Sequence, residues 1–161
     1  MSTQPVMTTV QVQRRNLHQS RAEQAPLPTL AEGQVLAEVE KFAFTANNVS
    51  YAVSGDFIGY WKYYPVDLPW GVIPVWGFAR VVQSRSADLP VGERVWGFLP
   101  MATHVVLTPG PTTAGRFEDK TPHRADLPSL YNAYDRVSPE PAGLRDDQRC
   151  LLFPLFATSY L

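Results

Sequence analysis

The stretch Val91-Gly92-Glu93-Arg94-Val95-Trp96-Gly97-Phe98 is the part of the sequence that decides the fold class. Its first residues end a turn, and Arg94 to Phe98 then has the composition of a β-strand. On the N-terminal side, Val72 to Val82 predicts a second strand, in which Gly77 marks a bulge or a close backbone approach. On the C-terminal side, Thr103 to Thr108 predicts a third strand. The middle of the chain is therefore predicted to be rich in strands.

The N-terminal part adds two further strands to this prediction. Val6 to Val12 alternates in the way expected of a half-buried strand. Gln34 to Phe44 alternates apolar residues with glutamates, which predicts a strand with one solvated face. Between the two, Arg14 to Gln24 is polar, and Pro26 and Pro28 predict a stiff connector. Nothing in this connecting segment predicts a strand.

A short helix and an irregular segment follow the Gln34 to Phe44 strand. Thr45 is suited to cap a helix that continues to Val53, because the apolar residues there repeat at helical spacing. Gly55 is expected to end this helix after about two turns. From Phe57 to Trp70 the sequence is aromatic and no single period fits it, so it is predicted to be a wall or loop.

The C-terminal third combines a predicted loop with a helix. Residues 109–126 are rich in Pro, Thr, Gly and charge, which predicts a long surface loop. Tyr131, Tyr134 and Val137 are spaced as in a short helix. Residues 144–161 have a helical pattern that Pro154 interrupts, and they are almost wholly apolar from Cys150 onward. We expect such an end either to have been truncated or to dock on a partner, and to cause self-association otherwise.

The composition excludes several classes of protein. The chain has 161 residues, of which 45% are hydrophobic, so it can bury a core and intrinsic disorder is not expected. A net charge of −1 argues against binding of nucleic acid. A single cysteine allows neither an internal disulfide nor a cysteine-rich zinc site. With no signal peptide or membrane segment visible in the sequence, the expected location is the cytoplasm and no membrane partner is expected.

Four stretches in this order resemble one known family of proteins. They are similar to the bacterial family DUF2855 and, more broadly, to the N-terminal GroES-like domain of the medium-chain dehydrogenase/reductase superfamily. The most specific is the stretch from Val91 to Phe98, preceded by Pro74 to Val82. The other three are Glu32 to Val39, Phe42 to Asn48 and Ala157 to Leu161.

The resemblance implies a fold and a domain division. The expected fold is mainly β with short helices, a partly open antiparallel β-barrel, in residues 1–138, with the loop insertion near 109–126. Residues 139–161 are then the start of a helix that leads to a Rossmann domain absent from this sequence. That domain, or a second chain, is an expected partner.

The resemblance also implies a function. The chain would be the substrate-side portion of an NAD(P)H-dependent oxidoreductase acting on a carbonyl, enone or quinone-like small molecule. NADP or NAD would serve the intact protein, but this chain has no Gly-x-Gly-x-x-Gly run to hold a pyrophosphate, so tight binding is not expected. Zinc-dependent members have metal ligands where this sequence has Thr45 and Trp76, so the likeness is to the zinc-free branch.

Four site residues are carried over from the family's pattern. Thr45, Asn48 and Tyr51 would supply neutral donors to a substrate oxygen, and Thr158 would lie beside the nicotinamide. Local roles compete with these assignments, since Thr45 can cap a helix, asparagines satisfy backbone groups, and Tyr51 can fill a wall. Asn48 also replaces the family's usual aspartate.

Other residues leave further alternatives open. Tyr60, Trp61, Tyr63, Tyr64, Trp70 and Trp76 can wall a pocket for a flat substrate or simply cover the core. Cys150 is expected to be buried and inert, and His104 to be structural. The alternative function is a GroES-like binding or scaffold module without chemistry. A glycine-rich strand–loop–helix later in the gene would favour the enzyme.

Overall fold

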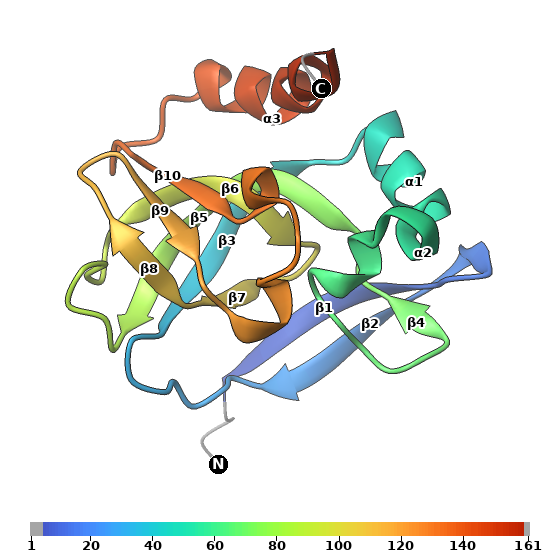
Figure 1. Ribbon diagram of the computed structural model, residues 1–161, viewed down its shortest axis with the longest axis horizontal. Helices are drawn as coiled ribbons and strands as arrows, with labels where there is room; N and C mark the ends of the chain where they lie inside the picture. The colour runs from blue at the N-terminus through green and yellow to red at the C-terminus, as the bar shows by residue number, and fades with distance from the viewer. Residues whose placement is uncertain (1–4, 160–161) are drawn as a thin grey trace.

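The computed structural model describes residues 5–159 and the side chains of residues 5–156. Within them the strands form two sheets, in which every pairing is antiparallel (Figure 1). One sheet has the order β2-β1-β4, with β1 at Val6–Gln13, β2 at Asn16–Pro26 and β4 at Trp70–Gly71. The other has the order β7-β3-β5-β6-β10-β9-β8. Its strands are β3 (Val35–Ala43), β5 (Pro74–Ser84), β6 (Arg94–Pro100), β7 (His104–Leu107), β8 (Pro109–Thr112), β9 (Arg116–Asp119) and β10 (Ala133–Val137).

The pairing of β3, β5 and β6 forms the centre of the large sheet. Gly77 of β5 lies opposite Gly97 of β6. A Cβ atom at Gly77 would lie 2.4 Å from the carbonyl oxygen of Lys41, next to a register shift in β3. Gly77 is thus a place of close backbone approach, as predicted. The sheet curls into a half-barrel, and the prediction of a mainly β, partly open barrel with short helices is confirmed.

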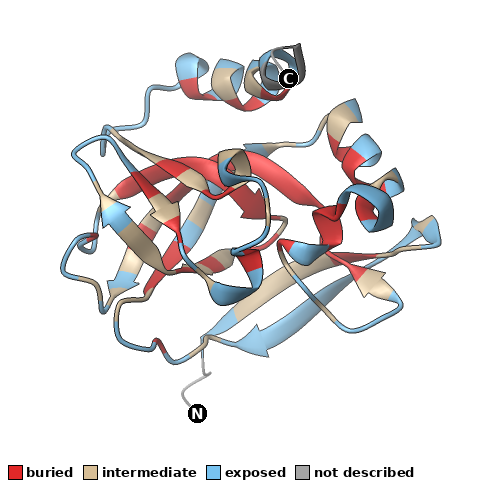
Figure 2. Ribbon diagram, viewed as in Figure 1, coloured by how far each residue is buried: buried red, intermediate tan, exposed pale blue. Residues whose placement is uncertain are grey.

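The two faces of the curled sheet bury different kinds of side chain. The inner face holds an aliphatic core, which we call the interior core: Val35, Ala37, Val75, Ala79, Val81, Leu89, Val95, Leu99, Val105 and Leu107, with Phe117 and Tyr134. The outer face holds an aromatic cluster, which we call the aromatic face: Tyr51, Tyr60, Tyr63, Trp76, Phe78, Trp96 and Phe98, with Cys150. Both faces are buried, and buried residues run through the central strands in Figure 2.

Helices cover the aromatic face. Helix α3 (Leu144–Ser159) lies across it, while α1 (Ala46–Val53) and α2 (Gly55–Ile58) pack at one end of the sheet (Figure 1). Short 3₁₀ turns lie in the connecting segments: η1 (Tyr60–Lys62) between α2 and β4, and η2 (Pro122–Arg124) and η3 (Ser129–Tyr131) between β9 and β10. Among the described residues, no helix combines the length and the apolar character that spanning a bilayer requires.

Three sequence predictions were wrong about local structure. The polar residues 14–24 are largely strand β2, which pairs with β1 from Val6↔Pro26 to Val12↔Ser20. Its side chains are almost all exposed, so no apolar alternation marks it. Pro154 lies inside α3 without ending it. The expected helix around Tyr131 and Tyr134 is instead η3 followed by β10.

The predicted loop at 109–126 is also wrong, because it contains a hairpin. Strands β8 and β9 pair with each other, and β9 pairs with β10, which attaches the hairpin to the large sheet. The prolines that suggested a loop lie in β8, which is an edge strand of this sheet. Edge strands tolerate proline because one side of the strand has no hydrogen-bonding partner.

Candidate functional site

The N-terminus of α1 contains two of the residues that the sequence proposed for catalysis. Thr45 is the N-cap residue, and its backbone N–H donates to the Oδ1 atom of Asn48 at 2.7 Å. The Nδ2 atom of Asn48 donates to the carbonyl oxygen of Pro74 at 2.9 Å. Asn48 is 2% exposed, and both ends of its amide are occupied by these contacts. The structure therefore gives Asn48 the role of joining α1 to β5.

Thr45 is the more accessible of the two. It is only partly buried, and its hydroxyl donates to Asn48 Oδ1 at 3.2 Å. A hydroxyl rotates freely, and this contact is long for an O–H donor, so Thr45 can turn to another acceptor at little cost. Thr45 thus retains a donor that a ligand oxygen could use.

Tyr51 lies in the aromatic face. Its ring is 4.5 Å from the ring of Tyr60 and 5.8 Å from that of Phe98, and the residue is 5% exposed. Burial raises the pKa of the Tyr51 hydroxyl, and the nearby indole N–H of Trp76 lowers it in part. That N–H makes no well-formed hydrogen bond with any described group. With a raised pKa, Tyr51 keeps its proton at neutral pH and can act as a hydrogen-bond donor.

A cavity of about 530 Å³ lies between the aromatic face, α3 and the β8–β9 hairpin, and we call it the outer cavity. Its apolar wall includes Trp76, Trp96 and Phe153. The two indole rings are nearly parallel with centroids 6.0 Å apart, and the ring of Phe153 meets Trp76 edge-on at 4.6 Å. Flat walls of this kind and a volume in this range suit a planar small molecule.

The polar side of the outer cavity contains charged residues. Arg116, Glu118 and Asp135 line it. Asp135 accepts from two guanidinium groups at once, Arg116 at 2.7 Å and Arg149 at 2.5 Å. The guanidinium of Arg149 also lies 4.6 Å from the centroid of the Trp96 ring, which is a cation–π distance. The outer cavity thus joins an aromatic wall to a rim of opposite charges.

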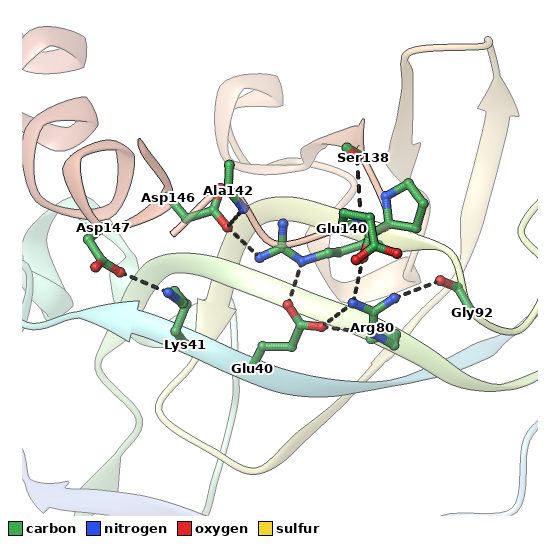
Figure 3. A network of polar contacts seen from close by, with 11 residues as sticks. Glu40, Lys41, Arg80, Gly92, Ser138, Glu140, Ala142, Asp146 and Asp147 are labelled. Atoms are coloured by element: carbon green, nitrogen blue, oxygen red, sulfur yellow. Dashed lines mark hydrogen bonds and ion pairs between the residues drawn. The ribbon is translucent and has the colours of Figure 1, made fainter. Parts of the chain in front are cut away.

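Ion pairs attach the first turns of α3 to the sheet (Figure 3). Arg94 of β6, which is 1% exposed, donates to Glu40 of β3 at 2.5 Å and to Asp146 of α3 at 2.8 Å. Burial alone would lower the pKa of Arg94, but the two carboxylates outweigh burial and raise it. Lys41 makes a further pair with Asp147 at 2.8 Å. These contacts hold α3 over the aromatic face and so close one side of the outer cavity.

The remaining predicted site residues fall in or beside α3. Thr158 belongs to α3, but its side chain lies outside the described residues, so its assignment stays a prediction. Cys150 is 4% exposed in the aromatic face, and burial raises its pKa to about 11. The prediction that Cys150 is buried is confirmed, and its lack of reactivity stays a prediction with which the raised pKa agrees. The outer cavity is lined by none of Thr45, Asn48 and Tyr51.

Sequence reasoning missed a second cavity, of about 320 Å³. Two of the histidines, His104 and His123, line it together with Tyr64 and Arg124. They are distant in sequence, so their spacing gave no signal. His104 contacts the hydroxyl of Thr103, and His123 contacts the carbonyl oxygen of Tyr63, so both have local partners. In the described part of the chain, no three His, Cys, Asp or Glu side chains group as metal ligands.

Trp76 and Trp96 both line the outer cavity, but only Trp76 stood out in the sequence. Trp76 was singled out because it stands where zinc-dependent proteins have a ligand. Trp96 drew no attention beyond its strand. Phe153 was noted only as part of the apolar stretch from Cys150 onward, and Arg116 carried no signal, because α3 and the β8–β9 hairpin meet the sheet only in three dimensions.

Comparison with known proteins identifies one family and several solved structures. The model described as "Protein of unknown function (DUF2855)" matches residues 42–161. No curated protein sequence matches the chain. Among solved structures, CurA from Vibrio vulnificus has a TM-score of 0.50 at 18% identity, over 72% of this chain and 33% of that chain. This similarity supports a shared fold.

Two more solved structures are similar over parts of the chain. A quinone oxidoreductase from Coxiella burnetii has a TM-score of 0.48 at 14% identity, over 80% of this chain and 40% of that chain. The mycobacterial protein Rv1454c, solved in complex with NADPH, has a TM-score of 0.42 at 20% identity, over 63% of this chain and 30% of that chain. This chain thus spans less than half the length of each of the three solved structures.

Proposed function

This chain belongs to the DUF2855 family, and we propose that it is the substrate-side portion of a zinc-free, NAD(P)H-dependent oxidoreductase. The observation that carries the proposal is the outer cavity of about 530 Å³, with Trp76, Trp96 and Phe153 as its flat wall. A planar conjugated carbonyl, enone or quinone matches such a wall in shape and polarity. The shared half-barrel fold supports the same proposal.

In this proposal the dinucleotide is held mainly outside the present sequence. The chain has no Gly-x-Gly-x-x-Gly run, so the residues present do not fit a pyrophosphate. A reduced nicotinamide, when bound, supplies hydride. Thr158 near the end of α3 is the proposed contact with it. Residues 1–138 are the proposed substrate domain, and residues 139–161 the proposed connection to a dinucleotide-binding domain.

The proposed chemistry of this chain is hydrogen bonding to a substrate oxygen. Thr45 has a rotatable hydroxyl, and Tyr51 keeps its proton because burial raises its pKa. Neither residue lines the outer cavity, so in this proposal the substrate oxygen extends past Trp76, which borders both the cavity and Tyr51, to a hydroxyl that stabilises its developing negative charge. Asn48 would act by positioning Thr45, since its own amide is occupied. No metal ligand takes part, in agreement with Thr45 and Trp76 at the positions where ligands would stand.

The exposed face of α3 agrees with a partner on that side. Leu151, Leu152, Leu155 and Phe156 are each about half exposed or more. We propose that a dinucleotide-binding domain or a second chain covers them, with self-association of this chain when neither is present. A cytoplasmic location completes the proposal, and the single buried thiol agrees with it.

The test is NADPH oxidation, followed by absorbance, in the longer protein that contains this chain. We expect turnover with 1,4-benzoquinone or an enone that a zinc chelator leaves unchanged. Tyr51→Phe and Thr45→Val should each lower kcat about tenfold with little change in KM. Tyr60→Phe is the matched control, because it removes a neighbouring hydroxyl that bonds only to Tyr131 among described groups. Absence of turnover across quinones, enones and aldehydes would contradict the proposal.

One observation favours the second candidate, a binding module without chemistry. Asn48 is fully occupied, Tyr51 is 5% exposed, and neither they nor Thr45 lines the outer cavity. A binding module needs only the cavity. If Thr45→Val and Tyr51→Phe leave ligand affinity unchanged and no turnover is found, this candidate is the better one.

A further inference from the structure

The charged rim of the outer cavity is not balanced. Arg116 and Arg149 share the single carboxylate of Asp135. Glu118, the other acidic residue of the lining, is paired with Lys120. The lining itself carries one cation, Arg116, and two carboxylates, Glu118 and Asp135. Lys120 and Arg149 pair with these carboxylates from outside the lining, so the five side chains together carry three positive and two negative charges. One positive charge is thus left without a carboxylate of its own.

Arg116 is the rim residue that can receive a further anion. Its side chain is 64% exposed, and only its Nε atom bonds to Asp135. Among residues 5–156 its two terminal nitrogens contact no acceptor, so their four N–H groups can bond to a ligand. A guanidinium with two free N–H groups binds a carboxylate through two parallel hydrogen bonds. Arg149, in contrast, is held between Asp135 and the ring of Trp96.

The aromatic wall and this rim belong to one cavity. Trp76, Trp96 and Phe153 line the same volume as Arg116. A ligand that lies flat against the rings can therefore reach the guanidinium with a substituent. We propose that the outer cavity selects planar conjugated ketones or quinones that carry a carboxylate, with Arg116 as the residue that recognises the carboxylate. The inference rests on the proposed function and narrows its substrate class.

A matched pair of probes tests the inference by equilibrium binding to this chain. The probes are anthraquinone-2-carboxylate and its methyl ester, which share a planar quinone and differ in the negative charge. Binding is followed by quenching of tryptophan fluorescence and confirmed by calorimetry. We expect the acid to bind about tenfold more tightly than the ester, and we expect added salt to weaken only the acid.

Variants then locate the effect. Arg116→Gln should remove the preference for the acid, a loss of about tenfold, and leave the affinity for the ester unchanged. Phe153→Leu should weaken both probes alike. Arg85→Gln is the control for a surface arginine, since Arg85 pairs with Glu32 away from this cavity. Thermal unfolding of each variant verifies that it is folded.

Three outcomes would overturn the inference. Equal affinities for acid and ester, an acid preference that survives Arg116→Gln, or no binding of either probe would each do so. Failure here leaves the proposed function testable on its own, because turnover of a neutral quinone by the longer protein needs no carboxylate. Turnover failing while the acid preference and its Arg116 dependence hold would instead leave a site for aromatic acids in a binding module.

Discussion

The interior core and the aromatic face are built by the same strands, yet they are filled differently. In β6, Val95 and Leu99 enter the interior core, while Trp96 and Phe98 enter the aromatic face. All four are at most 2% exposed. Alternation along this strand therefore separates aliphatic from aromatic side chains instead of apolar from polar ones. A strand buried on both faces needs apolar residues throughout, and their shape then decides what each face can do.

The two faces also differ in how they are closed. The curled sheet closes the interior core with mostly branched aliphatic side chains, although the second cavity reaches its edge at Val105. The aromatic face is closed by α3, which is attached through Arg94, Lys41 and Arg149. Large flat rings under a helix pack less completely, and the outer cavity remains between them. The lesson is that the interior core stabilises the fold, whereas the aromatic face leaves room for a ligand.

The largest effect is expected from breaking the attachment of α3. Arg94→Met removes the buried guanidinium between Glu40 and Asp146 and leaves Asp146, which is 6% exposed, without its cation. Removal of one partner of a buried ion pair costs about 3 to 5 kcal/mol of unfolding free energy. Urea unfolding measures this loss. The double variant Arg94→Met with Asp146→Asn should recover part of it.

The matched control for Arg94 is Arg85→Gln. Arg85 and Glu32 are exposed at 54% and 86% of their side chains, so removal of this pair should change stability by less than about 0.5 kcal/mol. Equal losses for Arg94→Met and Arg85→Gln would mean that ion pairs do not hold α3. The contrast between the two faces would then need another explanation.

A second test compares one side chain from each face. Leu99→Ala empties a fully buried position of the interior core and should cost about 3 kcal/mol of unfolding free energy. Phe153→Ala removes a side chain that already borders the outer cavity, so it should cost about half as much. Ligand affinity should respond in the opposite order, so that Phe153→Ala weakens binding in the outer cavity more than Leu99→Ala does. A larger loss for Phe153→Ala in urea unfolding would show that the aromatic face carries the stability.

Many of the strands could be predicted from the sequence, because alternation and turns report local structure. Val6 to Val12, Gln34 to Phe44 and Arg94 to Phe98 are strands where expected. Strand β2 could not be found in this way, because its exposed side chains show no period and pairing with β1 alone makes it a strand. Strand β8 was concealed by prolines that an edge position tolerates.

The candidate site was predicted less well than the fold. Trp76 was identified from its place in a motif, and it does line the outer cavity. Asn48 was identified in the same way, but its amide is used to hold Pro74 and Thr45. Arg116 and Phe153 come from segments that meet only after folding. A motif can therefore point to a residue type at a position, but it cannot show whether the polar atoms of that residue are free.

A third test addresses how tightly the interior core is filled. A Cβ atom at Gly97 would lie 2.3 Å from the ring of Tyr134, which is rigid and fully buried. Gly97→Ala should therefore cost about 2 kcal/mol of unfolding free energy. Gly115→Ala is the control, because no heavy atom lies within 4 Å of its Cβ position. If both variants unfold at the same urea concentration, the interior core can accommodate an added methyl group. The difference in packing between the interior core and the aromatic face would then be smaller.

The smallest effect on stability at neutral pH is expected from replacing Cys150. The reactivity of this thiol measures how well the aromatic face excludes water. Burial raises the pKa of its thiol from 9.0 to about 11, although Lys41 lowers it in part. At pH 8 the thiolate is then about 100-fold scarcer than for a thiol of pKa 9.0, so iodoacetamide should label the folded chain at least about 100-fold more slowly than the urea-unfolded chain. Because the folded pKa is the higher one, this group's contribution to stability is complete below pH 9 and is lost as the pH rises towards 11. The stability difference between the parent chain and Cys150→Ala should accordingly shrink over that range, as measured by urea unfolding at pH 8 and pH 10. Equal labelling of the folded and unfolded chains would mean that water reaches Cys150 beneath α3, and that the aromatic face is open where the interior core is closed.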